Sequence, residues 1–138
     1  MADTLSFELV SPERLLLSRE VEMVVVPGTE GDFGVLPSHA PLISQVRPGI
    51  LVVFDGGKPT DRIFVSGGVA EVTPERCTVL AEEAMPVEAL DRADAERQIA
   101  DGKDDLAEAR SDLERGKAER SIEIGEAKLA ALAGGSPY

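Results

Sequence analysis

Residues 24–43 read VVVPGTEGDFGVLPSHAPLI, a block in which three consecutive valines pass into a segment rich in glycine and proline. Consecutive valines are typical of a β-strand, and the glycines that follow predict a tight hairpin tip whose backbone needs positive φ angles. The tip carries Glu30 and Asp32 and lacks the Gly-Lys-Ser/Thr ending of a phosphate-binding loop. It therefore predicts a turn, or an acidic contact loop, and no phosphate site.

Short apolar segments continue this pattern on both sides of the block, and glycine or proline recurs between them. Many short strands separated by turn signals predict an antiparallel β-sandwich or barrel. The strand candidates are Leu5–Leu9, Val21–Val25, Ile50–Phe54, Arg62–Val65, Val69–Val72 and Thr78–Leu80.

The amino-acid composition changes at Pro86. Eight of the nine prolines lie at or before this residue, and charged residues rise from 19 of the first 86 residues to 21 of the last 52. Sequence that is almost free of proline and rich in Ala, Glu, Lys, Arg and Leu is typical of helices. The sequence therefore predicts two domains, an all-β sandwich over residues 1–86 and a helical domain over residues 87–138.

Small and apolar residues recur in the second domain with a heptad-like spacing, which breaks between residues 113 and 118. A turn near residues 113–114 makes the two stripes face each other, with Gly102 opposite Gly125, and predicts an antiparallel two-helix hairpin with a flexible tail. One long helix with a stutter is the alternative. The stripes are Ala95, Ile99, Gly102, Leu106, Ala109 and Leu113, and then Ala118, Ile122, Gly125, Leu129 and Leu132.

The formal net charge of the protein is −12. A field of this sign repels nucleic acid and anionic lipid, so the sequence predicts neither nucleic-acid binding nor direct lipid insertion. The same charge favours a basic protein surface as partner.

Reactive side chains are few, since the sequence has one cysteine, Cys77, and one histidine, His39. These two residues are too few for a zinc site of the usual kind, and no metal or cofactor is predicted. A small hydrolase built on a Cys77–His39 pair is one alternative function. However, Cys77 lies in a predicted strand, where a small buried hydrophobic residue is the simpler interpretation. We therefore predict no catalytic residue.

Five stretches together resemble the epsilon subunit of bacterial F-type ATP synthases, which is homologous to the mitochondrial delta subunit. The resemblance implies a sandwich of about ten strands followed by two helices. It also implies a non-catalytic rotor subunit of the central stalk, which couples proton-driven rotation of the c-ring to ATP synthesis, with possible regulation of ATP hydrolysis by the helices. The matching stretches are residues 7–12, residues 26–43, residues 47–51, residues 65–72 and residues 78–84.

The resemblance further implies partners and contact residues. The c-ring contact falls on the hairpin tip, and the gamma-subunit contact falls on residues before and after it. The helices imply a contact with the alpha/beta catalytic head, and the whole protein is expected to be peripheral to the membrane, on the cytoplasmic face of the bacterial inner membrane. The c-ring residues are Gly28, Thr29, Glu30, Gly31, Asp32 and Phe33, and the gamma residues are Ser11, His39, Ala40, Leu42 and Ser44.

Some members of this family bind ATP through a Leu-Asp-x-x-Arg-Ala motif at the start of the first helix. Here residues 90–95 carry Asp91 of that motif, but Asp94 replaces the arginine and would repel a phosphate. We expect no ATP binding and assign Asp91 to capping the helix. A nucleotide-sensing regulatory module remains as an alternative function.

Overall fold

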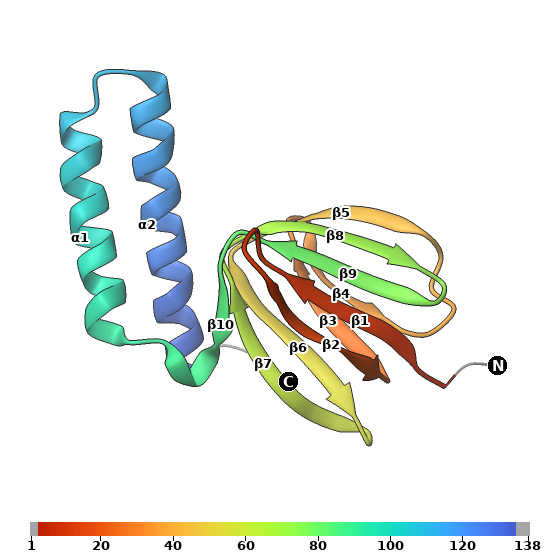
Figure 1. Cartoon of the computed structure of the whole chain (residues 1–138). Coiled ribbons are helices and arrows are strands. Elements are labelled where there is room, and N and C mark those ends of the chain that lie inside the picture. The colour runs from red at the N-terminus through yellow and green to blue at the C-terminus, as the bar shows by residue number, and fades with distance from the viewer. Residues whose placement is uncertain (1–2, 135–138) are drawn as a thin grey trace. The chain divides into compact units, whose positions relative to one another are not determined.

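The computed structural model describes residues 3–134, which form ten strands, a short 3₁₀ helix and two α-helices (Figure 1). Two compact units divide between Pro86 and Val87. The flexible tail predicted from the sequence lies outside the described residues. The elements are β1 (Leu5–Val10), β2 (Leu15–Val21), β3 (Met23–Gly28), β4 (Gly31–Val35), β5 (Leu42–Val46), β6 (Gly49–Asp55), β7 (Lys58–Val65), β8 (Gly68–Thr73), β9 (Arg76–Ala81), β10 (Ala84–Pro86), η1 (Val87–Ala89), α1 (Arg92–Glu108) and α2 (Asp112–Leu132).

The first unit is a sandwich whose two layers are joined at one corner. One layer has the strand order β10-β7-β6-β3-β4, and the other has the order β5-β8-β9-β1-β2. Strand β3 pairs with β6 at Met23–Val25, and then with β5 through the single pair of Gly28 and Val46. Gly28 is therefore the residue at which β3 passes from one layer to the other.

Strands β1 and β9 pair in parallel, and all the other strand pairs in the described range are antiparallel. The expectation of a purely antiparallel sandwich is thus wrong for this pair. About seventy residues separate the two strands in the sequence, so no local turn signal reports their relative direction. The strand expected over residues 21–25 is confirmed for residues 23–25, but its start is wrong, because β2 ends at Val21 and β3 begins at Met23.

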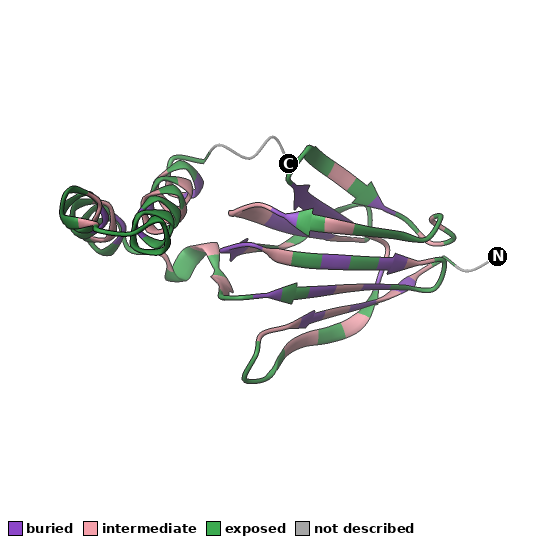
Figure 2. Ribbon diagram, turned by 90° about the horizontal axis from the view of Figure 1, so that it is seen from above, coloured by how far each residue is buried: buried purple, intermediate pink, exposed green. Residues whose placement is uncertain are grey.

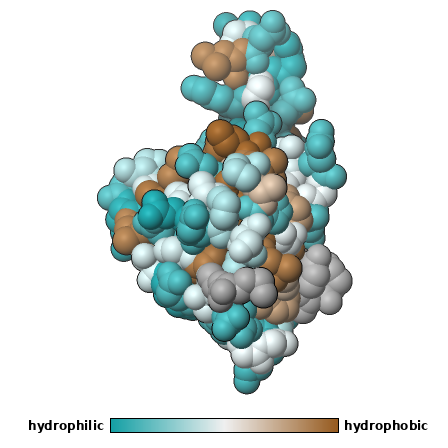
Figure 3. Space-filling model, turned by 90° about the vertical axis from the view of Figure 1, so that its right-hand side faces the viewer, coloured by the Kyte–Doolittle hydropathy of each residue, from teal (hydrophilic) through white to brown (hydrophobic). Residues whose placement is uncertain are grey.

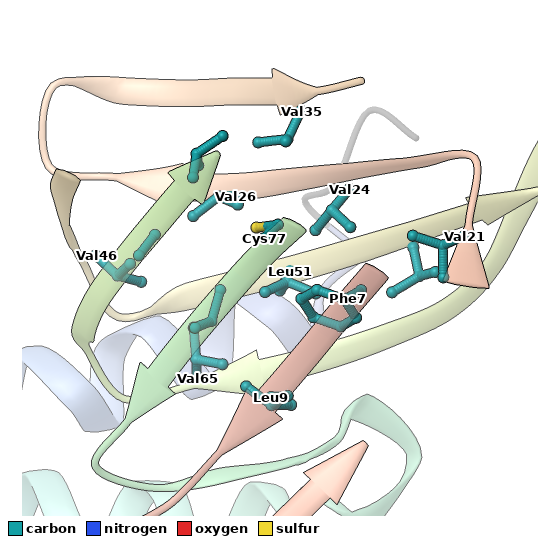
Figure 4. Packing of buried hydrophobic residues seen from close by; sticks show 14 of the residues in the cluster. Phe7, Leu9, Val21, Val24, Val26, Val35, Val46, Leu51, Val65 and Cys77 are labelled. Atoms are coloured by element: carbon teal, nitrogen blue, oxygen red, sulfur yellow. The ribbon is translucent and has the colours of Figure 1, made fainter. Parts of the chain in front are cut away.

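The core lies between the two layers and is built mainly from valine and leucine. Phe7, Leu51 and Val24 come from different strands and point toward one another in the close-up view (Figure 4). All three side chains are fully buried. Figure 2 shows that buried residues gather on the strands, whereas the helices of the second unit are mostly exposed. Hydrophobic burial therefore stabilises the sandwich far more than the hairpin.

An ion-pair cluster connects the two layers and joins β2 of one layer to β7 of the other. The Arg19 guanidinium on β2 contacts the Asp61 carboxylate on β7, and its Nε lies 3.8 Å from Asp55 Oδ2. Thr60 Oγ1 also donates to Asp61 at 2.9 Å. Burial alone would raise the pKa of Asp61, but the hydrogen bonds from Arg19 and Thr60 and the charge of Arg19 lower it below the usual 3.8.

The second unit is the expected antiparallel hairpin, but its turn lies earlier than residues 113–114. Helix α1 ends at Glu108, and α2 begins at Asp112 after the N-cap Ser111. The Ser111 hydroxyl accepts from the Glu114 backbone N–H at 3.1 Å, and the Glu114 carboxylate accepts from the backbone N–H of Arg110. This arrangement resembles a capping box and fixes the start of α2.

The earlier turn also changes which residues face each other. Leu113, expected in the seam, is 69 % exposed. The predicted pairing of Gly102 with Gly125 is wrong, because each glycine instead receives an isoleucine of the other helix. A Cβ atom at Gly102 would lie 2.7 Å from Ile122 Cγ1, and one at Gly125 would lie 2.7 Å from Ile99 Cγ1. Each glycine therefore leaves a space in the helix–helix interface, and an isoleucine side chain of the other helix fills it.

We expect the ion-pair cluster around Asp61 to make the free energy of unfolding depend on pH. Because the folded pKa of Asp61 is depressed, its contribution is present above the unfolded pKa of about 3.9 and is lost as the pH falls through the folded value. Asp61→Asn should lower the free energy of unfolding by up to about 1 kcal/mol at pH 7. Urea unfolding at pH 7 and pH 3 measures this difference, which should shrink at pH 3. Glu75→Gln, in the exposed β8–β9 turn, is the control, and an equal difference at both pH values would contradict the assignment.

Alanine substitutions at the three helical glycines should have opposite effects. Gly116 has no neighbouring atom within 4 Å of an added Cβ, so Gly116→Ala should stabilise α2 by up to about 1 kcal/mol. Gly102→Ala and Gly125→Ala should destabilise the hairpin by about 1–3 kcal/mol, because the added methyl group collides with isoleucine. Thermal melts followed by circular dichroism at 222 nm test this contrast. Stabilisation by all three substitutions would disprove the register.

Candidate functional site

The β3–β4 hairpin forms an exposed tip at the corner of the sandwich. Gly28 pairs with Gly31 at its base, and Thr29 and Glu30 make the turn. Gly31 has a φ of 131°, which satisfies the expected need for a positive φ angle. Residues 29–32 are exposed, whereas Phe33 packs against the core and anchors the tip.

Arg47 braces this tip from the segment between β5 and β6. Its Nη1 donates to the Gly28 carbonyl oxygen at 2.5 Å, and its Nη2 donates to Asp32 Oδ1 at 2.6 Å. The backbone N–H of Arg47 donates to the Pro27 carbonyl at 2.8 Å, and the N–H of Thr29 donates to the Gln45 carbonyl at 3.1 Å. The tip is therefore held by backbone bonds and by one guanidinium that contacts both of its strands.

The two acids of the tip have different surroundings. Asp32 forms an ion pair with Arg47 of the same chain, and both side chains are partly exposed. No hydrogen bond or ion pair joins the side chain of Glu30 to another residue in the described range 3–134. Asp32 thus has a cation within the protein, and the assignment of both acids to the c-ring contact stays a prediction.

His39 and Ala40 lie in the loop between β4 and β5. Ser38 has a φ of 70° after Pro37, and the backbone N–H of His39 donates to the Leu36 carbonyl at 3.2 Å, which are features of a type II turn. His39 Nδ1 lies 2.7 Å from the Ala40 carbonyl oxygen, so Nδ1 carries the proton. The N–H of Ser38 donates to the Pro74 carbonyl and ties this loop to the β8–β9 turn.

Ser11 lies in the β1–β2 turn, at the far end of the same layer. It exchanges two backbone hydrogen bonds with Arg14, of 2.9 and 3.3 Å. The turn borders a shallow polar cavity of about 260 Å³, whose lining also includes Glu82 and Glu83.

The other two predicted gamma-contact residues, Leu42 and Ser44, are on β5. They alternate with Ile43 and point to the same side as the buried Val46. Leu42 is 39 % exposed, whereas Ile43 on the opposite, outer side is 73 % exposed. Sequence reasoning missed Ile43, because Leu42 and Ile43 are both apolar and the pattern could not show which of them faces outward.

An apolar stripe crosses the outer face of this layer, and sequence reasoning missed it as well. Leu15 pairs with Val10, Val10 with Leu80, and Leu80 with Val69, so the four side chains share one face. Leu15 is 54 % exposed, Leu80 53 % and Val69 40 %. Val69 pairs in turn with Gln45, the residue whose carbonyl holds the hairpin tip. Isolated exposed apolar side chains are ordinary, but four apolar side chains paired across neighbouring strands indicate a contact surface.

The space-filling view shows hydrophobic patches on an otherwise mainly hydrophilic face of the sandwich (Figure 3). Acidic residues border the stripe, since Glu71 of β8 and Glu8 of β1 occupy the next outward position along their strands. Arg76 lies 3.7 Å from Glu8 and offsets part of this charge.

Cys77 does not form a nucleophilic site. Its side chain points into the core between the layers, where it is fully buried (Figure 4). Burial raises the pKa of its thiol to about 12, so the thiolate is scarce near neutral pH. His39 lies in a surface turn and bonds to a backbone carbonyl. This geometry gives no support to the hydrolase alternative.

The start of α1 is built as a helix cap. Asp91 Oδ1 accepts from the backbone N–H of Ala93 at 2.8 Å and of Asp94 at 3.4 Å. Asp94 in turn lies 3.7 Å from Arg97. Asp91 therefore has the capping role assigned from the sequence, and the two carboxylates make this helix start acidic.

Within residues 3–134, no group of three or more His, Cys, Asp or Glu side chains is arranged to hold a metal ion. Neither described α-helix has the length and apolar character required to cross a bilayer.

Comparisons with known proteins cover nearly the whole sequence. Residues 4–87 match the family model described as ATP synthase, Delta/Epsilon chain, beta-sandwich domain. Residues 91–137 match the family model for the C-terminal domain of the ATP synthase epsilon chain. Both matches agree with the resemblance inferred from the sequence.

Similar proteins carry the same description. The protein is 54 % identical over 134 residues to the ATP synthase epsilon chain of Rhodospirillum rubrum, an alignment that spans 97 % of this chain and 100 % of that relative. It is 55 % identical over 138 residues to the epsilon chain of Rhodospirillum centenum, spanning 96 % of this chain and 94 % of the relative.

Solved structures show the same architecture. A chain in the Euglena gracilis mitochondrial ATP synthase OSCP/F1/c-ring structure has a TM-score of 0.79 and 27 % identity, over 96 % of this chain and 83 % of that one. A chain in the Tetrahymena thermophila mitochondrial central stalk/c-ring structure has the same fold, with a TM-score of 0.65 and 13 % identity, over 90 % of this chain and 96 % of that one. Sequence, family models and structure agree, and the chain belongs to the ATP synthase epsilon chain family, whose members are accessory subunits of that enzyme.

Proposed function

We propose that this protein couples rotation of the membrane c-ring to the gamma subunit, at the cytoplasmic face of a bacterial inner membrane. The hairpin tip contacts the c-ring, and the outer face of the β5-β8-β9-β1-β2 layer contacts gamma. Support for a c-ring partner comes from the Euglena assembly, which contains a c-ring together with a chain similar to this one.

The observation that carries the proposal is that two unlike contact surfaces adjoin on one packed body. The apolar stripe ends at Val69, which pairs with Gln45, and the carbonyl of Gln45 holds Thr29 in the tip. A load applied to the tip therefore reaches the outer face through backbone hydrogen bonds and a close-packed core, without a flexible linker. Transmission of torque requires such a connection.

The outer face has the character expected of a protein interface. Its centre is the apolar stripe of Leu15, Val10, Leu80 and Val69, and carboxylates lie beside it. An apolar centre with a polar rim is the usual arrangement of an interface. Ile43 joins the proposed contact residues here.

The hairpin is the proposed contact for the alpha/beta head and the element through which ATP hydrolysis is regulated. Its seam contains small residues, with Ala95, Gly102, Ala118 and Gly125 buried. Such a seam buries little apolar area, so the packed hairpin is separated from other arrangements by a small free energy. A segment of this kind is suited to exchange between partners.

Charge on the outer face should weaken binding to gamma without unfolding the sandwich. Ile43→Glu together with Leu80→Glu places two carboxylates where exposed apolar side chains now lie. We expect affinity for purified gamma to fall at least tenfold in calorimetry, with an unchanged melting temperature. Lys58→Glu, at the exposed start of β7, is the matched control. Wild-type affinity of the double variant for gamma would contradict the assignment of the gamma contact to this face.

Charge reversal at the tip should weaken docking to the c-ring. Glu30→Lys replaces the acid that has no internal partner in the described structure, so it should reduce binding to c-ring vesicles about five- to tenfold. In the reconstituted complex, ATP-driven proton pumping should fall relative to ATP hydrolysis. Asp101→Lys on the exposed face of α1 is the control for net charge. Normal docking of Glu30→Lys would refute the assignment of the tip.

A further inference from the structure

We propose that Arg47 is a positioning residue for the c-ring contact. It fixes the shape of the β3–β4 tip and neutralises Asp32, so that Glu30 alone presents a carboxylate to the ring. This inference rests on the proposed function of the tip and adds a division of roles between its two acids.

The Arg47 guanidinium contacts both strands of the β3–β4 hairpin. Nη1 bonds to the carbonyl of Gly28 at the end of β3, and Nη2 bonds to Asp32 on β4, so one planar group spans both strands of the hairpin. Arginine is suited to this role because its donors form a rigid fork, whereas a lysine ammonium is a single point charge on a flexible stem. The backbone N–H of Arg47 also bonds to Pro27, which fixes the origin of the side chain.

Arg47 contacts the residue at which β3 changes its pairing partner. Gly28 is where β3 leaves β6 and pairs with β5, and a single residue pair makes that connection. A Cβ at Gly28 would lie 2.8 Å from the Gly31 carbonyl oxygen and 3.0 Å from the Phe33 ring, so the corner is closely packed. Arg47 holds the carbonyl group of this same residue, and the direction of the tip depends on its contact.

The Arg47–Asp32 ion pair leaves one net negative charge at the hairpin tip. Glu30, Asp32 and Arg47 sum to a net charge of −1, and the Asp32–Arg47 pair is neutral within itself. The Arg47 and Asp32 side chains are 40 % and 31 % exposed, so the pair is partly shielded from water. The remaining charge lies at Glu30, in the turn itself. The tip therefore offers one directed carboxylate to a basic partner.

Substitution of Arg47 separates this account from a simple effect of net charge. Arg47→Gln makes the tip more negative, from −1 to −2, so attraction to a basic ring surface would strengthen if charge alone mattered. If Arg47 positions the tip, the same substitution weakens docking. We expect at least a fivefold loss of affinity for c-ring vesicles carrying the gamma subunit of the same complex. Lys58→Gln, with the same change of charge at the exposed start of β7, should leave affinity unchanged.

A double-mutant cycle with Glu30→Gln tests whether Arg47 acts through Glu30. Positioning predicts that Arg47→Gln costs little further affinity in the Glu30→Gln background, whereas a general structural defect would cost the same in both backgrounds. Arg47→Lys keeps the charge and the fold but cannot span both strands, so it should lose most of the same affinity. Amide exchange at Thr29 should accelerate in both Arg47 variants at an unchanged melting temperature.

The outcomes distinguish this inference from the proposed function. Weaker docking of Glu30→Lys with unchanged or tighter docking of Arg47→Gln overturns the role of Arg47 and leaves the tip as the c-ring contact. Normal docking of both variants overturns the two proposals together. Should Arg47→Gln fail to fold, Arg47→Lys decides the matter, since docking of that variant at wild-type affinity contradicts positioning.

Discussion

The corner at Gly28 is the constraint on which the rest of the structure depends. There β3 changes partner from β6 to β5, so strand pairing between the two layers that enclose the core consists of the pair of Gly28 and Val46. The absence of a side chain at Gly28 allows the Gly31 carbonyl and the Phe33 ring to approach closely, and Arg47 secures the Gly28 carbonyl. The corner therefore closes the sandwich and also directs an acidic turn outward, which links the fold directly to its proposed contact.

The two units suit different tasks because they are packed differently. In the sandwich, large side chains such as Phe7 and Leu51 are fully buried, and the Arg19 cluster connects the layers. In the hairpin, glycine and alanine line the seam, and two isoleucines enter the holes that the glycines provide. Greater burial makes the first unit the stiffer of the two, and stiffness suits transmission of torque. A lightly packed hairpin suits an element that exchanges partners.

The sequence predicted the fold class because valine runs, turn residues and the helical composition are local signals. It failed where long-range contacts decide the structure, as in the parallel pairing of β1 with β9. The hairpin turn was misplaced because Leu113 continued the apolar spacing, while the Ser111 cap was overlooked. The tip was predicted from its glycines and acids, but the contact of Arg47 with Asp32, fifteen residues away, could not be predicted. Nor could the stripe, since its members come from four strands and meet only through register.

The central claim is that the tip and the outer face contact different partners while belonging to one rigid body. Site-specific photo-crosslinking in the assembled complex tests it most directly, with a photoreactive side chain placed at position 30 in one sample and at position 43 in another. The account predicts that position 30 crosslinks to a subunit of the c-ring and position 43 to gamma. Crosslinks from position 30 to gamma, or from neither position to either partner, would contradict it.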